Sequence, residues 1–138
     1  MKYTLVFIFS NDFSKVLMIH KTKGPYPGCL NGIGGKIEPT DRDELHGALR
    51  EVMEETGLSP LVMTPLRFLV KETHPSGTEL NVFYTRLGYL ARETQIEEEK
   101  LEWFKVEELL DVRDRRLAGE GNIPYFINYA LMTEGVTI

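Results

Sequence analysis

Short apolar runs rich in β-branched and aromatic residues divide the first third of the chain. Residues 3–9 (YTLVFIF) and 15–20 (KVLMIH) predict two strands, and the Ser-Asn-Asp segment between them predicts the turn of a hairpin. Residues 21–30 (KTKGPYPGCL) are interrupted by glycine and proline and predict a loop. This loop leads into a short predicted strand over residues 31–35.

The second half repeats the strand pattern and then becomes more polar. Residues 66–73 and 80–90 predict two strands across a turn at residues 75–77 (PSG). After an acidic run, residues 103–106 (WFKV) predict a further strand, which leads into a helix over residues 106–111. The pattern therefore predicts a mixed α and β fold.

A longer helix is predicted in the middle of the chain. It begins near Asp41 or Asp43, because acidic residues suit the first turn of a helix. Gly57 ends it as a left-handed C-cap, and Leu58 closes the cap with an apolar contact. Gly47 costs this helix about 1 kcal/mol relative to alanine, which favours a close approach between the helix and the sheet; a neutral substitution is the alternative.

A final helix is predicted from Asn122, because Pro124 is compatible with a first helical turn. Four large side chains fall on one stripe of this helix, and helical periodicity predicts that they belong to the core: Tyr125, Phe126, Tyr129 and Met132.

Composition limits the classes of function. With 138 residues, we expect one domain spanning residues 1–138. A net charge of −5 argues against a nucleic-acid-binding surface, and the longest apolar run, at residues 5–9, is too short to cross a membrane. We interpret the N-terminus as a first strand and not as a signal peptide. Cys29 is the single cysteine, which fits a reducing, cytoplasmic environment.

The predicted central helix carries a cluster of carboxylates. Offsets of three and four residues place Glu51, Glu54 and Glu55 on one helical face, where they repel one another. A hard divalent cation such as Mg²⁺ offsets that repulsion, and Arg50 can brace Glu54 one turn away. The alternative is an ordinary solvated acidic face. Gly34-Gly35, just before the helix, favours the metal interpretation because its backbone can approach an ion or a phosphate closely.

This segment resembles the signature of the Nudix hydrolases, G-x5-E-x7-R-E-U-x-E-E-x-G-U, where U is bulky and apolar. The stretch from Arg50 to Leu58 (REVMEETGL) matches its second half without gaps. The first half departs, since Gly35 lies fifteen residues before Arg50 instead of fourteen. The glutamate of the pattern falls on Asp41 or on Arg42, depending on the direction of counting.

The resemblance implies an α+β fold, namely a Nudix-type α/β/α sandwich with a mixed sheet. It also implies binding of Mg²⁺, or of Mn²⁺, and hydrolysis of a nucleoside diphosphate linked to a further group. By motif position, Glu51, Glu54 and Glu55 hold the metal and Gly35 adds a carbonyl, while Arg50 orients the glutamates. Members of the family often add one glutamate from a later loop. Glu97, Glu98 and Glu99 lie in about the right place, Glu97 or Glu98 is preferred, and Glu98 is taken as the candidate ligand.

The substrate is not encoded in the signature. The run from Leu30 to Lys36 (LNGIGGK) resembles the W-N-G-F-G-G-K run of the oxidised-purine nucleoside triphosphatases, in which the asparagine contacts the purine. Asn31 is therefore a candidate base contact and Lys36 a candidate phosphate contact; a strand-end asparagine and a surface lysine are the alternatives. A match to the same group makes Glu120 or Asn122 a candidate for the base edge.

We expect a Mg²⁺-dependent hydrolase that converts a nucleoside triphosphate, with 8-oxo-dGTP as one candidate, to a monophosphate and pyrophosphate. The alternatives are Nudix activity on ADP-ribose, a nucleotide sugar or dihydroneopterin triphosphate, and a non-catalytic nucleotide-sensing domain. The expected partner is a small nucleotide, with no nucleic-acid polymer and no membrane, and the chain is expected to be a monomer or a homodimer.

Overall fold

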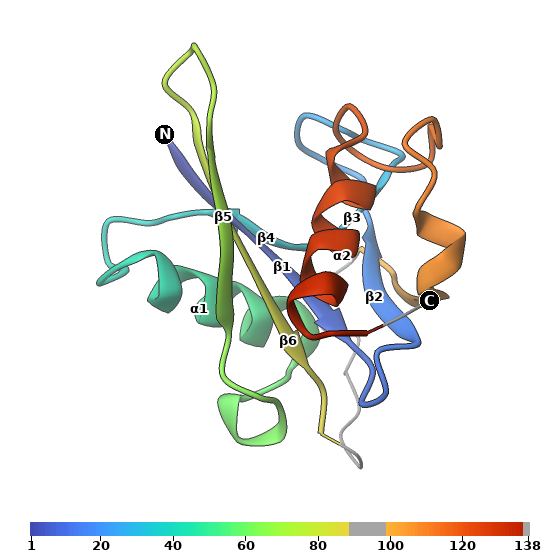
Figure 1. Ribbon diagram of the computed structural model, residues 1–138. Helices are drawn as coiled ribbons and strands as arrows, with labels where there is room; N and C mark the ends of the chain where they lie inside the picture. The colour runs from blue at the N-terminus through green and yellow to red at the C-terminus, as the bar shows by residue number, and fades with distance from the viewer. Residues whose placement is uncertain (89–98, 137–138) are drawn as a thin grey trace.

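The computed structural model describes residues 1–88 and 99–136. Within these residues, a seven-stranded mixed sheet lies between helix α1 (Glu44–Thr56) and helix α2 (Asn122–Thr133) (Figure 1). Two short 3₁₀ helices, η1 (Pro60–Val62) and η2 (Val106–Leu109), complete the structure. The strands are β1 (Lys2–Phe9), β2 (Lys15–His20), β3 (Leu30–Asn31), β4 (Ile33–Lys36), β5 (Arg67–Thr73), β6 (Glu79–Arg86) and β7 (Leu101–Lys105).

Strand β1 is the centre of the sheet. It pairs with β6 in parallel along its whole length, whereas its pairings with β2 and β4 are antiparallel. β4 pairs with the first half of β1 and β2 pairs with its end, so the sheet divides on that side. The mixed sheet expected from the resemblance is confirmed.

Side chains of β1 alternate between two cores. Phe7 and Phe9 pack on the α2 side, whereas Val6 and Ile8 pack on the α1 side. Because both faces of β1 are covered, its run of apolar residues is almost uninterrupted. The α/β/α sandwich is therefore also confirmed.

Several local predictions agree with the structure, and two predicted elements differ in extent or type. The predicted strand over residues 31–35 is two short strands, because β3 pairs with β2 while β4 pairs with β1. The predicted helix over residues 106–111 is wrong in type, since this segment forms the 3₁₀ helix η2. Part of the predicted strand over residues 80–90 lies outside the described residues.

The ends of α1 follow from single residues. Asp43 is the N-cap, and its carboxylate accepts a hydrogen bond of 2.8 Å from the backbone N–H of His46. Asp41, the other candidate start, lies outside the helix. Gly57 ends α1 with φ of 73°, and its N–H donates to the carbonyl of Met53 at 3.0 Å.

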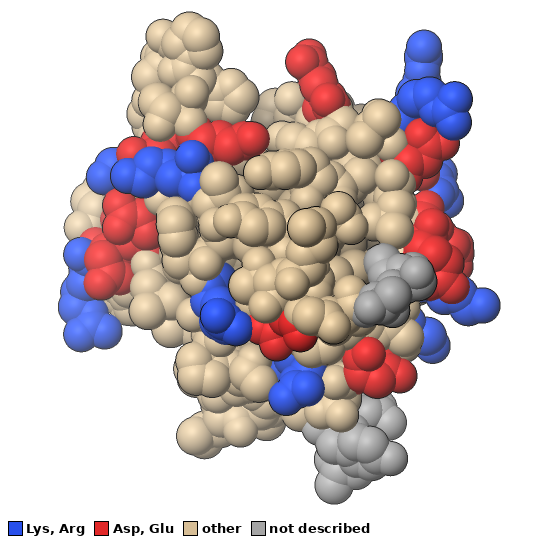
Figure 2. All heavy atoms as spheres, in the orientation of Figure 1, with Lys and Arg blue, Asp and Glu red and all other residues tan. Residues whose placement is uncertain are grey.

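The prediction for the stripe on α2 is wrong for three of its four residues. Phe126 is fully buried, but Tyr125 and Met132 are 52% and 68% exposed and Tyr129 is also exposed. The helix instead turns a neighbouring face to the sheet, formed by Ile123, Phe126, Ile127, Ala130 and Leu131. The middle of the molecular face over α2 is largely uncharged, and most charged side chains lie toward its margins (Figure 2). No helix in the described part of the chain is both long and apolar enough to span a membrane.

Candidate functional site

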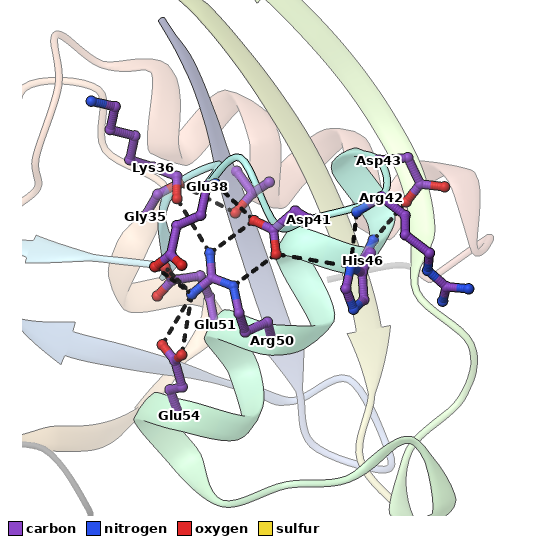
Figure 3. Close-up of polar contacts among 11 residues, drawn as sticks. Gly35, Lys36, Glu38, Asp41, Arg42, Asp43, His46, Arg50, Glu51 and Glu54 are labelled. Atoms are coloured by element: carbon purple, nitrogen blue, oxygen red, sulfur yellow. Dashed lines mark hydrogen bonds and ion pairs between the residues drawn. The ribbon is translucent and has the colours of Figure 1, made fainter.

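The guanidinium of Arg50, in the middle of α1, is the centre of a cluster of carboxylates from this helix and from the loop before it. It donates hydrogen bonds of 3.1 Å to a carboxylate oxygen of Glu51 and of 3.1 Å to one of Glu54 (Figure 3). It also donates to the backbone carbonyl of Lys36 at 3.3 Å. These contacts hold the two glutamates and the end of β4 around the positively charged guanidinium of Arg50.

Asp41 is the strongest partner of Arg50. The two groups form a bidentate pair with distances of 2.9 and 3.0 Å, and the Asp41 side chain is only 1% exposed. Hydrogen bonds from Arg50 lower the pKa of Asp41 to about 2. The sequence left Asp41 and Arg42 open as counterparts of the first glutamate of the signature, and the structure places Asp41 at Arg50.

The position of Asp41 also accounts for the departure in spacing and for Gly47. Asp41 lies six residues after Gly35, as the signature requires of its glutamate, so the extra residue falls between Asp41 and Arg50. A Cβ atom at Gly47 would lie 3.0 Å from the Asp41 carboxylate. The glycine inside α1 thus admits a buried carboxylate from the preceding loop.

The other two signature carboxylates lie against the paired glycines of β4. Glu55 accepts a hydrogen bond of 3.3 Å from the N–H of Gly34, and a Cβ atom at Gly35 would lie 2.7 Å from the Glu51 carboxylate. Burial, followed by the charge of Glu51, raises the pKa of Glu55 to about 8. Burial likewise raises the pKa of Glu51. Burial therefore raises the pKa of both carboxylates, although the Arg50 guanidinium partly opposes this effect at Glu51.

The chemistry of these donors fits a hard divalent cation. Carboxylate oxygens and a backbone carbonyl are ligands that Mg²⁺ accepts, and a dication would offset the repulsion between Glu51 and Glu55. Among the residues the structure describes, no three His, Cys, Asp or Glu side chains are grouped as a ready metal site, and Glu54 is turned toward Arg50. The residues that would hold a cation are Glu51, Glu54 and Glu55, together with the carbonyl of Gly35.

Glu97 and Glu98, the candidates for an additional ligand, lie outside the described residues. Glu99 is described, and its carboxylate accepts hydrogen bonds from the Lys21 ammonium at 3.0 Å, from Thr22 and from the N–H of Lys23 at 3.3 Å. Burial opposes its ionisation, but these hydrogen bonds lower the pKa of Glu99 to about 2. Glu99 therefore anchors residues 21–23 close to Glu55, whose titration feels the charges of both Lys21 and Glu99.

A cavity of about 860 Å³ adjoins the paired glycines on the α2 side of the sheet. β1 and β4 contribute its floor, which includes Leu5, Gly34 and Gly35. The loop before β3 and the start of α2 form part of its wall, and the β5–β6 hairpin forms another part. None of the signature carboxylates is among the lining residues, but Gly34 and Gly35, which Glu55 and Glu51 contact, lie at the edge of a space large enough for a nucleotide.

Three of the four predicted substrate contacts line this cavity: Asn31, Glu120 and Asn122. Lys36 does not line it; its side chain is exposed and extends away from Arg50 (Figure 3). Other polar residues of the lining were not predicted from the sequence as substrate contacts, among them Lys21, Tyr26, Glu72 and His74. They belong to segments without a motif, and only the strand registers bring them together.

The two asparagines present complementary groups. The Oδ1 atom of Asn31 accepts a hydrogen bond of 2.8 Å from the N–H of Gly32, and its Nδ2 has no partner in the described part of the chain. The Oδ1 atom of Asn122 is buried and has no hydrogen-bond partner there either. A Cβ atom at Gly119, where φ is +80°, would lie 2.2 Å from this oxygen, so the glycine makes room for the Asn122 side chain.

Comparison with known proteins identifies the family to which this fold and this signature belong. The model of the NUDIX domain family matches residues 2–124. No curated protein sequence matches the chain. Solved structures with similar folds include the NUDIX domain of Shewanella oneidensis NrtR complexed with ADP ribose, with a TM-score of 0.72 and 19% identity over 97% of this chain and 88% of that one.

A Caenorhabditis elegans Ap4A hydrolase has a TM-score of 0.73 and 14% identity over 96% of this chain and 98% of that one. A MutT structure, from a study of Aliivibrio salmonicida and Vibrio cholerae, has a TM-score of 0.70 and 16% identity over 91% and 93% of the two chains. At these identities the similarities establish the fold alone. Because the family model covers most of the chain and the helical half of the signature is complete, the chain belongs to the NUDIX family and is a Nudix pyrophosphohydrolase.

Proposed function

We propose that this Nudix hydrolase converts a purine nucleoside triphosphate, oxidised forms included, to a nucleoside monophosphate and pyrophosphate, with Mg²⁺ as cofactor. The observation that carries the proposal is that two asparagines, Asn31 and Asn122, line the same cavity as Gly34 and Gly35. Amide groups pair with the donor and acceptor edges of a purine.

The free groups of the two asparagines favour a particular kind of base. Asn31 offers N–H donors, and the Oδ1 atom of Asn122 needs a donor from the ligand. Guanine provides a carbonyl acceptor together with N–H donors. Oxidation at position 8 converts N7 from an acceptor to a donor next to that carbonyl, which increases the match. This chemistry supports the inclusion of 8-oxo-dGTP among the candidate substrates.

The signature residues have separate roles in this proposal. When bound, Mg²⁺ would neutralise phosphate charge and lower the pKa of an attacking water. Glu51, Glu54, Glu55 and the Gly35 carbonyl would hold it, with Glu98 as the candidate additional ligand. Arg50, fixed by Asp41, orients Glu51 and Glu54. Lys36, at the exposed end of β4, would contact a phosphate from outside the cavity.

The test is a substrate panel in Mg²⁺ that scores pyrophosphate against phosphate release and identifies the nucleotide products by chromatography, because ADP-ribose, Ap4A and nucleotide sugars release neither ion. It contains ATP, GTP, dGTP and 8-oxo-dGTP, and also a nucleotide sugar and dihydroneopterin triphosphate. ADP-ribose and Ap4A are included because one similar structure is a complex with ADP ribose and another is an Ap4A hydrolase. We expect pyrophosphate and a monophosphate from purine triphosphates. Turnover confined to ADP-ribose, Ap4A or a nucleotide sugar would overturn the proposed substrate class.

A further inference from the structure

The β5–β6 hairpin directs a glutamate into the cavity. This hairpin extends beyond the rest of the sheet (Figure 1), and Glu72 lies opposite Leu80 in its register. Both residues line the cavity, and Leu80 and Val70 pack against the core on the α2 side. Because side chains two residues apart on a strand lie on the same face, Glu72 shares the face of Val70, which is turned toward α2. A carboxylate therefore lies on a face that is otherwise apolar.

Glu72 has no internal partner. Within the described residues, no hydrogen bond or ion pair reaches its carboxylate, although the residue is half-buried. The nearby ammonium of Lys71 lies on the outer face of the hairpin, where it pairs with Glu79 at 3.7 Å. An unpaired carboxylate at the wall of a cavity carries a desolvation cost that a hydrogen-bond donor on a ligand would offset.

The wall formed by the start of α2 has the same character. Glu120, which is exposed, adds a further carboxylate to the cavity wall, and the buried Oδ1 atom of Asn122 is unpaired among the described residues. Lys21 is the one lysine or arginine among the described lining residues, and its ammonium is already paired with Glu99. This surplus of acceptors disfavours phosphate in the cavity and favours the nucleoside, which carries donors on its base and its sugar.

We propose that Glu72 is a specificity-determining residue that accepts hydrogen bonds from the sugar hydroxyls of the nucleotide, so that ribonucleotides bind more tightly than 2′-deoxyribonucleotides. The two oxygens of one carboxylate suit two adjacent hydroxyls, as in dinucleotide-binding folds where an acidic residue binds the ribose. The base is assigned to the asparagines and the phosphates to the edge at Gly34 and Gly35. The inference rests on the proposed function for the entry of a nucleotide into this cavity.

The experiment is calorimetric titration of the full chain in Mg²⁺ with GMP and dGMP. We expect wild type to bind GMP roughly 10- to 100-fold more tightly than dGMP, the range for a hydrogen bond to a charged group. Glu72→Ala should remove this preference by weakening GMP more than dGMP, which keeps one of the two sugar hydroxyls, and Glu72→Gln should give an intermediate ratio. Glu79→Gln, on the outer face of the same hairpin, should keep the wild-type ratio. Thermal melting checks that each variant is folded.

Three results would overturn the inference: equal affinities of wild type for GMP and dGMP, an unchanged ratio in Glu72→Ala, or an equal loss of both ligands in that variant. The last result would indicate that Glu72 maintains the conformation of the hairpin and does not contact the sugar. Because binding requires no hydrolysis, these results are independent of the substrate panel. If the chain hydrolysed only ADP-ribose, the proposed substrate class would be wrong. The Glu72-dependent preference for ribose could still be observed.

Discussion

The carboxylate cluster of α1 and the cavity beside it differ in how fully their polar groups are paired within the chain. Arg50 alone binds Asp41, Glu51 and Glu54 (Figure 3). Across the cavity, Glu72 and the Oδ1 atom of Asn122 have no partner among the described residues. Internal hydrogen bonds therefore preorganise the carboxylate cluster, whereas the polar groups of the cavity need hydrogen bonds from a ligand.

The largest expected effect tests the cluster itself. Glu54→Gln removes a ligand charge with little change in volume, and Arg50 keeps its bidentate contact with Asp41. We expect turnover to fall by about 100-fold or more, because the metal contributes several kcal/mol to transition-state stabilisation. Steady-state kinetics in Mg²⁺ measures this, with Glu107→Gln in η2 as a surface control. Wild-type turnover in Glu54→Gln would remove Glu54 from the metal site.

Asp41→Asn tests whether preorganisation matters for both folding and activity. The variant weakens the buried pair that holds Arg50, so we expect a lower melting temperature and turnover reduced roughly 10- to 100-fold, as for groups that orient ligands. Asp41→Glu is the matched control, because it retains the charge but adds a methylene beside Gly47. It should fall between wild type and Asp41→Asn. If Asp41→Asn lost stability but kept full turnover, Asp41 would have no positioning role.

Asn122→Ala tests the opposite expectation for the cavity. Its Oδ1 atom is unpaired, so removal should leave the melting temperature unchanged or slightly higher, unlike removal of the Asp41 charge. The KM for a purine triphosphate should rise by about tenfold, since one hydrogen bond to the base is lost. Thermal melting and steady-state kinetics separate the two effects. A marked loss of stability would show that the cavity wall is as interdependent as the cluster.

A separate effect is expected on the pH dependence of stability in metal-free protein. The pKa of Glu55 is raised from 4.5 to about 8, so the folded chain holds more protons than the unfolded chain between these values. The free energy of unfolding should therefore fall as pH rises from about 4.5 to about 8. Thermal melts in EDTA measure this slope. Mg²⁺ or Glu55→Gln should reduce it; an unchanged slope in Glu55→Gln would assign the effect to another group.

Periodicity in the sequence determined the local structure around the site. The spacing from Arg50 to Leu58 placed the arginine and three glutamates on one helix, and Gly57 marked its end. Apolar runs likewise predicted the β1–β2 hairpin and the strands that became β5 and β6. These features depend on backbone geometry and on neighbours within one or two turns, which a sequence contains directly.

Tertiary structure decided the features that depend on residues far apart in the chain. Asp41 could be assigned to Arg50 only when the loop before α1 was folded against Gly47. The exposure of Tyr125 on α2 depended on which of two apolar stripes met the sheet, and periodicity alone does not rank them. Glu72 entered the cavity because strand register and the position of the hairpin relative to α2 set its surroundings. Such relations arise from packing between distant segments, so the sequence determined the helix that carries the signature, and only the fold decided what surrounds the substrate.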